Sequence, residues 1–386
     1  MGDAGTHAEA RARKPFTSWT GTGGRLGVAL FFLYAFLVGV KSLEQGIATF
    51  GGDFVDQVFG SVANPIAGLA AGVLATVLVQ SSSVSTATIV GLVGSGVLPV
   101  ETAVPMVMGA NIGTTVTNTL ASLGHVRNNA YFERALAAAT VHDYFNLLSV
   151  AVLLPLEIAT GLISTIARGV ANVVDGLLPA AGTGGSPVKD AIKAPVSWLT
   201  KVIEPMGSTT VEGAVLLTLG IGAIFVALWM ITRQMKAVMS GRIENAINGI
   251  LGKGVGASAM VVGLLMTVAV QSSSITTSIL VPLVAAGVLT LRNAFPVTLG
   301  ANLGTTVTAL LASIAADAPE ALVIALVHVT FNVLGILIFY PVPQLRRLPM
   351  NMAVSTARAA VRKKSLVAGY VIGLFVILPL AILLIA

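Results

Sequence analysis

Long apolar runs alternate with short polar segments along almost the whole chain. Runs at residues 26–43, 211–231, 321–340 and 366–385 are continuous in apolar character, and a membrane-spanning helix needs roughly 20 such residues. These runs are rich in Gly, Ala and Leu and lack the alternation, about ten residues long, that marks the strands of a membrane barrel. The pattern therefore predicts an all-α integral membrane fold.

Two longer apolar runs, 62–98 and 254–289, are interrupted at their centres by the same polar block. The block is Gln-Ser-Ser-Ser, at residues 80–83 and 271–274. Polar backbone at membrane depth is tolerated only where protein or a water-filled cavity covers it. We interpret each run as a re-entrant helical hairpin whose tip faces an internal site.

The chain contains an internal repeat. Residues 80–122 align without a gap with residues 271–313, and more than half of the pairs are identical. The repeat includes Gly-Ala-Asn-x-Gly-Thr-Thr-Val-Thr at 109–117 and 300–308. Because this polar, glycine-containing motif interrupts an apolar span in each copy, the sequence predicts one broken transmembrane helix per repeat.

Basic residues indicate how the repeats are oriented. Lys and Arg occupy the loops that the span order places inside, and the two short external loops have none. This asymmetry predicts a cytoplasmic N-terminus and antiparallel repeats, an arrangement typical of transporters. The expected order is a cytoplasmic tail (1–25), a first inverted repeat (26–156), an external linker with short interfacial helices (157–210), a second inverted repeat (211–342), and a basic cytoplasmic segment with a final span (343–386).

Composition supports the membrane assignment and excludes several other classes. With 55% hydrophobic and 10% charged residues, the chain lacks the polar surface of a soluble protein. The absence of cysteine excludes disulfides and thiolate metal sites. The net charge of +6 comes without a basic run or aromatic platform for nucleic acid. No nucleophile–base pair or cluster of metal ligands stands out, so no enzyme is expected.

The hairpin tips carry the candidate chemistry. Each second hairpin helix should present unpaired N–H groups and a positive dipole end at the membrane centre, where hydroxyls and amides join them around a tetrahedral oxyanion. The predicted anion ligands are Gln80, Ser81, Ser82, Ser83, Gln271, Ser272, Ser273, Ser274, Asn111 and Asn302. No Lys or Arg lies near either block in the sequence, so a bound cation is expected to neutralise the anion. The oxygens of Thr114, Thr115, Thr117, Thr305, Thr306 and Thr308, with freed carbonyls, would suit sodium.

Each of these features also has a purely structural interpretation. A single Ser or Thr in a membrane helix usually bonds a carbonyl one turn back, but two matched Gln-Ser-Ser-Ser blocks favour a site. Asp143 either assists a cation or pairs with His142 or a backbone group, and repeat two has Val329 at the matched position. His142 and His328 are expected to orient helices rather than to shuttle protons.

Several motifs resemble the type II sodium-dependent phosphate cotransporter family. They are the Gln-Ser-Ser-Ser blocks, the Gly-Ala-Asn motif, Ala-Thr-Val-His-Asp-Tyr-Phe-Asn at 139–146, Val-Leu-Leu-Pro-Leu-Glu at 152–157 and Tyr-Pro-Val-Pro at 340–343. The resemblance implies sodium-driven uptake of inorganic phosphate, held between the tips during alternating access. It also implies sodium ligation at Ala301, Thr305 and Thr308, with Ala301 offering only its carbonyl. Asn128 stands where charge-moving animal members carry Asp, which implies electroneutral transport.

The remaining expectations concern partners and alternatives. Inorganic phosphate, sodium and the lipid bilayer are the expected partners, a homodimer is one possible assembly, and neither nucleic acid nor an organic cofactor is expected. The resemblance favours a bacterial inner-membrane protein. The alternatives are a transporter of another tetrahedral oxyanion such as sulfate or arsenate, a phosphate-binding membrane sensor, and a passive channel.

Overall fold

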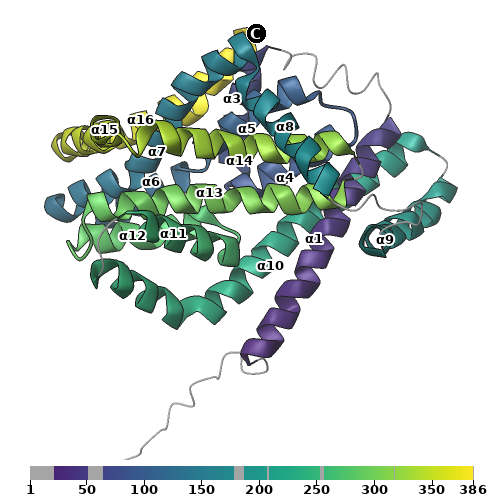
Figure 1. Cartoon of the computed structure of the whole chain (residues 1–386), viewed down its shortest axis with the longest axis horizontal. Coiled ribbons are helices and arrows are strands. Elements are labelled where there is room, and N and C mark those ends of the chain that lie inside the picture. The colour runs from purple at the N-terminus through teal and green to yellow at the C-terminus, as the bar shows by residue number, and fades with distance from the viewer. Residues whose placement is uncertain are drawn as a thin grey trace, which may run out of the picture.

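The computed structural model describes residues 21–50, 64–177, 187–206, 208–252, 256–316 and 318–385, which form helices and no strand (Figure 1). The helices are α1 (Thr22–Phe50), α3 (Pro65–Val79), α4 (Ser82–Gly94), α5 (Val100–Gly113), α6 (Val116–Ser122), η2 (Leu123–His125), α7 (Asn129–Thr160), α8 (Leu162–Leu177), α9 (Pro187–Ile203), η3 (Glu204–Met206), α10 (Thr209–Gly252), α11 (Ala257–Val270), α12 (Ser273–Ala285), α13 (Leu291–Ala315), α14 (Pro319–Phe339), α15 (Pro343–Arg362), α16 (Ser365–Ile372), η4 (Gly373–Ile377) and α17 (Leu378–Ile385).

Six stretches of the described chain are long and apolar enough to cross a membrane. They lie in α1, α7, α10, α13, α14 and the continuous run from α16 to α17. Each meets the roughly 20-residue length that a bilayer core requires. The protein is therefore an all-α, multi-pass integral membrane protein, as the apolar pattern predicts.

The helices that flank the two Gln-Ser-Ser-Ser blocks are too short to cross a membrane. Helices α3 and α4 have 15 and 13 residues, and α11 and α12 have 14 and 13, against the roughly 20 that a span needs. Each pair is joined by a tight turn at the block. The predicted helical hairpins are therefore present, although the ends at residues 62–63 and 254–255 lie outside the described residues.

Close glycine contacts hold each hairpin against a neighbouring span. A Cβ atom added at Gly72 would lie 2.0 Å from the Met106 carbonyl oxygen, and one added at Gly263 would lie 2.0 Å from that of Val297. The same relation joins Gly109 to Leu69, with a Cβ 2.1 Å from its carbonyl oxygen. Small residues let membrane helices approach to backbone contact. The pairs α3–α5 and α11–α13 therefore pack by the same device.

The first spans of the two repeats pack against each other, also through glycine. A Cβ at Gly46 of α1 would lie 2.5 Å from the Leu217 amide nitrogen, and one at Gly220 of α10 would lie 2.5 Å from that of Leu43. Helices α1 and α10 meet just right of the centre of Figure 1. This contact joins one repeat directly to the other.

The predicted broken helices are present in the first repeat and absent from the second. Helix α5 ends at Gly113 and α6 begins at Val116, with a turn at Thr114 and Thr115. By contrast, α13 continues through the matched motif at 300–308 without interruption. The prediction of a second broken span is therefore wrong, because the same residues remain helical in a different setting.

The connections also differ in part from the sequence interpretation. The loop expected between the apolar runs 26–43 and 62–98 starts later than those bounds imply, because α1 continues to Phe50 and buries Glu44 beside Lys41, with Nζ and Oε1 2.6 Å apart. The rest of that loop lies outside the described residues, as do residues 1–20 of the predicted tail. Within the predicted linker, α8 and α9 are short amphipathic helices, and the external position of this linker stays a prediction.

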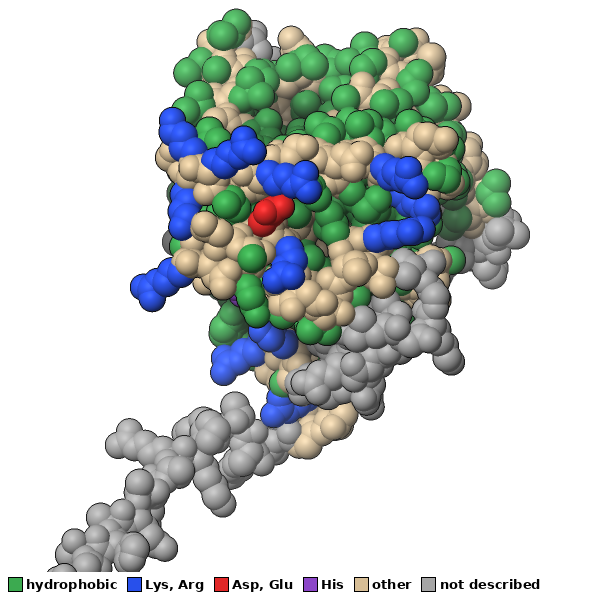
Figure 2. Space-filling model, turned by 90° about the vertical axis from the view of Figure 1, so that its left-hand side faces the viewer, with side chains coloured by type: hydrophobic (Ala, Val, Ile, Leu, Met, Phe, Trp, Pro, Cys, Tyr) green, Lys and Arg blue, Asp and Glu red, His purple; other side chains and the backbone are tan. Residues whose placement is uncertain are grey.

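The basic C-terminal segment is helical up to Arg362. Helix α15 buries Ala353, Ala357 and Ala360 and packs along α7, and most of its Arg side chains stay at the surface. Figure 2 shows the face at the left of Figure 1, where Lys and Arg side chains are widespread and acidic ones are scarce. We call this the basic face.

Candidate functional site

Each hairpin turns at a glutamine in the left-handed backbone conformation. Gln80 has φ 55° and Gln271 has φ 57°, and no other described non-glycine residue has a positive φ. Both side chains fold back, with Nε2 donating to the Val77 carbonyl at 2.5 Å and to the Val268 carbonyl at 2.6 Å. A left-handed non-glycine residue costs about 1–3 kcal/mol and is typical of functional sites. The two turns share this strained geometry.

The first serine of each block caps the helix that follows. Ser81 Oγ accepts the Val84 N–H at 3.3 Å, and Ser272 Oγ accepts the Ile275 N–H at 3.4 Å. The remaining N–H groups of the first turns of α4 and α12 have no intrahelical partner, and the helix dipole makes these ends positive. The caps therefore direct two helix N-termini toward the turns.

The two turns meet each other in space. Ser83 Oγ donates to the Gln271 carbonyl at 3.3 Å. Thr308 Oγ1 lies 3.4 Å from Ser83 Oγ and donates to Gln271 Oε1 at 2.9 Å. On the opposite side, Thr117 Oγ1 donates to Gln80 Oε1 at 3.1 Å. Both hairpins and one span from each repeat therefore converge at one place.

Several donors at this meeting point have no protein partner. No hydrogen bond among the described residues involves the hydroxyls of Ser82, Ser273 or Ser274. Ser82 and Ser273 are buried, and Ser274 is half-buried. With the N-terminal N–H groups of α4 and α12, these hydroxyls form a set of neutral donors suited to a tetrahedral oxyanion.

The two predicted asparagine ligands lie in a different polar network. Asn302 Nδ2 donates to Asn146 Oδ1 at 2.8 Å, and Asn146 Nδ2 donates to the Asn111 carbonyl at 2.7 Å. His328 Nε2 lies 3.3 Å from Asn111 Oδ1, and Asn332 Nδ2 lies 3.4 Å from it. No described hydrogen bond joins Asn111 or Asn302 to the Gln-Ser-Ser-Ser turns. Asn146, His328 and Asn332 therefore connect the two repeats through these asparagines.

Most of the predicted sodium ligands make local backbone hydrogen bonds. Thr114 Oγ1 donates to the Ala110 carbonyl at 2.9 Å, Thr115 Oγ1 to that of Ile112 at 2.8 Å, and Thr305 Oγ1 to that of Ala301 at 3.2 Å. A hydroxyl that donates in this way keeps its lone pairs for a cation. Thr117 and Thr308 differ from the others because they reach the hairpin glutamines.

Asp143 is a buried acidic residue whose partner the sequence did not determine. Its side chain has no exposed surface, and Oδ2 accepts the Tyr370 hydroxyl at 2.9 Å and the Thr119 hydroxyl at 3.3 Å. Oδ1 has no hydrogen-bond partner. The Tyr370 contact could not be found from the repeat, because α16 lies outside it. Asp143 thus pairs with hydroxyls of α6 and α16 rather than with His142.

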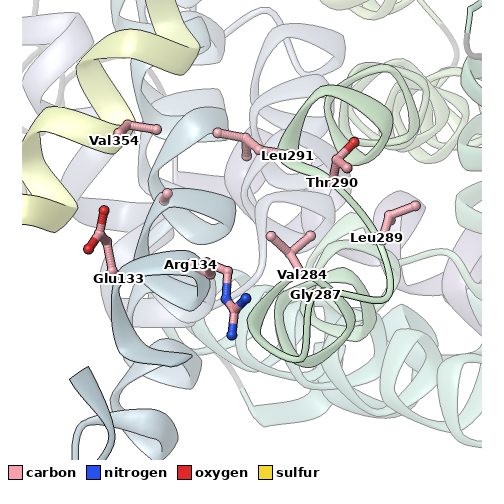
Figure 3. A pocket seen from close by; sticks show the side chains of 9 residues that line it. Glu133, Arg134, Val284, Gly287, Leu289, Thr290, Leu291 and Val354 are labelled. Atoms are coloured by element: carbon pink, nitrogen blue, oxygen red, sulfur yellow. The ribbon is translucent and has the colours of Figure 1, made fainter. Parts of the chain in front are cut away.

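A cavity of about 380 Å³ lies away from the tips, among α7, α15 and the α12–α13 turn. Figure 3 shows the Arg134 guanidinium directed toward Gly287, whereas the Glu133 carboxylate lies on the other side. Glu133 Oε1 accepts from Arg358 Nε at 3.3 Å. The cavity lining is mainly apolar and carries one charge of each sign, so it does not resemble an anion site.

Comparison with known proteins identifies the family. The family model described as Na+/Pi-cotransporter matches residues 35–175 and 223–347. Sodium-dependent phosphate transport protein 2A of Rattus norvegicus is 34% identical over an alignment 432 residues long, gaps included, which covers 92% of this chain and 66% of the rat protein. Protein 2B of Homo sapiens is 32% identical over 453 residues, covering 93% of this chain and 65% of the human protein.

The match includes the hairpins and the spans that pack against them. This chain spans just under two thirds of the length of these relatives. No solved structure matches it. Because the family model covers both Gln-Ser-Ser-Ser blocks and more than half of the residues, the chain belongs to the Na+/Pi-cotransporter family.

Proposed function

We propose that this protein is a sodium-coupled symporter that takes up inorganic phosphate and holds it between the two Gln-Ser-Ser-Ser turns. The observation that carries the proposal is the 3.3 Å contact from Ser83 Oγ to the Gln271 carbonyl, because it makes the two turns parts of one site. The names of the relatives, which specify sodium-dependent phosphate transport, support the choice of cargo and coupling ion.

The chemistry of the site explains why a cation would be needed. Helix N-termini and serine hydroxyls donate hydrogen bonds to an oxyanion but do not neutralise its charge. Sodium binds neutral oxygens, and Thr117 and Thr308 bring such oxygens to Gln80 and Gln271. Ions on these oxygens would lower the cost of bringing phosphate to the membrane centre, which couples the two cargoes.

The arrangement of the hairpins supports alternating access. In the proposed inverted topology, one hairpin enters the membrane from each side, and the turns close the path at the midplane. Movement of the hairpin-bearing core would then open the site to one side at a time. A passive channel would need a continuous path through this plane.

Uptake into proteoliposomes tests the proposal. An inward sodium gradient should drive accumulation of labelled phosphate, and replacement of sodium by choline should abolish it. The Ser83→Ala/Ser274→Ala variant should lose uptake, whereas Ser278→Ala, a serine that bonds the Ile275 carbonyl within α12, should retain it. Equal uptake in choline would contradict sodium coupling.

The neutral donor set also suits other tetrahedral oxyanions, because it recognises shape and charge. Arsenate and sulfate should therefore be included as competitors in the same assay. If sulfate competes better than phosphate, the cargo is a different oxyanion, and the proposal that the two turns bind a tetrahedral oxyanion still holds.

The proposed location is the inner membrane, with the N-terminus in the cytoplasm. The chain has no cysteine, so a single introduced cysteine reports one position. A cysteine at position 52 should react from outside and one at position 240 only from inside. Reaction of both from the same side would contradict the inverted repeats.

A further inference from the structure

A polar pocket, separate from the hairpin turns, lies where α13, α14 and α15 come together. It has a volume of about 300 Å³ and is lined by Arg292, Asn293, Tyr340 and Arg346. Arg292 and Asn293 belong to the first turn of α13, Tyr340 follows the last residue of α14, and Arg346 lies in the first turn of α15. No acidic side chain lines the pocket. We call it the arginine pocket.

Neither arginine of this pocket has an anionic partner in the described part of the chain. The ion pairs recorded there join Lys41 to Glu44, Arg168 to Glu101 and Arg358 to Glu133. No side-chain hydrogen bond among the described residues involves Arg292 or Arg346. Arg292 is exposed and Arg346 is half-buried, and the Arg346 guanidinium carbon stacks 5.4 Å from the centre of the Tyr340 ring. The stacking fixes this guanidinium but leaves its N–H donors available.

The positions of the two arginines within their helices are electrostatically unfavourable. A helix N-terminus carries a partial positive charge, so cations are favoured at the opposite end. Arg292 and Arg346 both lie in first turns, and neither first turn contains an acidic residue. Two cations and two positive helix ends therefore share one small space. A bound anion would offset this local cost.

The arginine pocket differs in charge from the other cavities. The larger cavity beside Arg134 has an apolar lining and contains Glu133. A third cavity, of about 280 Å³, is lined by Lys41 and Lys193, but Lys41 is already paired with Glu44 at 2.6 Å. The arginine pocket thus combines two unpaired guanidinium groups with an amide and a phenol. Arginine in this setting is typical of phosphate recognition.

We propose that the arginine pocket binds a phosphate group. Arg292 and Arg346 donate to its oxygens from two helices, and the Asn293 amide and Tyr340 hydroxyl add neutral donors. The group comes either from the headgroup of an anionic phospholipid at the membrane surface or from free inorganic phosphate. This site is separate from the one between the hairpin turns, and it does not depend on the cargo proposed above.

Binding to the reconstituted protein tests the proposal. The Ser83→Ala/Ser274→Ala background removes the proposed midplane site, and Arg292→Gln/Arg346→Gln is compared with Arg347→Gln in nanodiscs. Arg347 is the exposed neighbour that does not line the pocket, so its loss controls for surface charge. One arm measures inorganic phosphate by equilibrium dialysis in phosphatidylcholine discs. The other measures retention of phosphatidic acid by native mass spectrometry.

The expected result is a loss of at least about tenfold in affinity in one arm for the double arginine variant, since two charge-assisted contacts are removed. Arg347→Gln should stay within about twofold. A loss in the dialysis arm identifies free phosphate, and a loss in the lipid arm identifies the headgroup. If the double variant and Arg347→Gln bind alike in both arms, the proposal is overturned.

A second measurement needs no variant that might fail to fold. Phenylglyoxal modifies accessible arginines, and peptide mass spectrometry can report Arg292, Arg346 and Arg347 separately in the unaltered protein. Inorganic phosphate or phosphatidic acid should slow modification of Arg292 and Arg346 at least about fivefold relative to Arg347, because bound phosphate occupies their donors. Equal rates for all three arginines with either ligand would refute the site.

Discussion

Residues 109–117 of the first repeat and 300–308 of the second share the same Gly-Ala-Asn-x-Gly-Thr-Thr-Val-Thr motif but differ in backbone structure. The first copy is broken between Gly113 and Val116, whereas the second lies inside the continuous helix α13. Residues common to both copies cannot explain this difference. The cause must lie in what each copy contacts.

In the first repeat, side chains outside the motif compete for its backbone. The Asn111 carbonyl accepts from Asn146 Nδ2 at 2.7 Å, while the Thr115 N–H bonds the Ile112 carbonyl at 3.3 Å, in a tighter turn. Among the described contacts, the Asn302 carbonyl of the second repeat accepts no side-chain donor. Such competition is a recognised way to interrupt a helix.

Directly after the motif, the first repeat has polar side chains where the second repeat has apolar ones. Asn118 Nδ2 donates to Thr277 Oγ1 at 2.7 Å, and Thr119 donates to Asp143 at 3.3 Å. The matched residues of the second repeat are Ala309 and Leu310, which have no side-chain donor. The shared motif therefore permits a break, and the polar contacts found in the first repeat favour it.

The largest expected effect tests what the repeats have in common. Alanine at Gly109 or Gly300 would place a Cβ 2.1 Å or 1.8 Å from a backbone carbonyl oxygen of α3 or α11. Because the backbone must move, each change should lower the free energy of unfolding by about 3 kcal/mol or more. The two changes should lower the unfolding temperature by similar amounts. Gly222→Ala, with no atom within 4 Å, is the control. Tolerance of one change but not the other would show that the packing is not equivalent.

The next effect tests whether both repeats serve one ligand. Ser83→Ala removes the hydroxyl that joins the two turns, and Ser274→Ala removes an unpaired donor to the proposed anion, worth roughly 1.5–3 kcal/mol. Each should weaken phosphate binding about tenfold or more, and the double change should be non-additive. Calorimetry at fixed sodium on the four proteins measures this, with Ser278→Ala as the control. Two phosphates per chain, each sensitive to one serine, would refute a shared site.

This comparison also shows which features can be predicted from the sequence alone. Apolar run length was enough to predict the spans and hairpins, because a bilayer imposes both length and internal hydrogen bonding. The repeated Gln-Ser-Ser-Ser block located the two turns, and the structure places them in contact through Ser83 and Gln271. These features depend on local composition or on duplication, which a single sequence displays.

Features that depend on contacts between distant residues could not be predicted in this way. The partner of Asp143 is Tyr370 in α16, and no spacing rule connects them. Asn146 bonds the Asn111 carbonyl two residues before the end of α5, although the motif itself is identical in α13. The arginine pocket likewise forms only when the ends of three helices meet.

A smaller effect tests how far the Asn118 contact stabilises the broken segment of the first repeat. Asn118→Ala removes the 2.7 Å bond to Thr277, and a neutral hydrogen bond contributes about 1 kcal/mol. Amide hydrogen exchange at residues 114–119 should therefore accelerate about fivefold. The matched segment 305–310 in α13 of the same protein serves as the control. Equal acceleration in both segments would mean that the contact stabilises the whole fold rather than the break.

The smallest expected effect concerns Asn128 at the start of α7, whereas α14 of the second repeat begins after Ala318, which has no side-chain cap. Asn128 caps α7, since Oδ1 accepts the N–H groups of Ala130 at 3.1 Å and Tyr131 at 3.2 Å. Asp caps about as well as Asn, so Asn128→Asp should change stability by only a few tenths of a kcal/mol. Thermal unfolding of the two proteins measures this, and Asn128→Ala should cost about 1 kcal/mol.

The uncharged side chain at position 128 also bears on how charge is balanced during transport. With an uncharged side chain at position 128, we expect two sodium ions to accompany divalent phosphate, so that no net charge moves. The unaltered protein in proteoliposomes should then show no reversal potential tied to the sodium and phosphate gradients. A voltage-dependent rate alone would not contradict this, because conformational steps can also sense voltage. A reversal potential that fits net inward positive charge would contradict it, and would mean that a further cation is transported without a carboxylate at position 128.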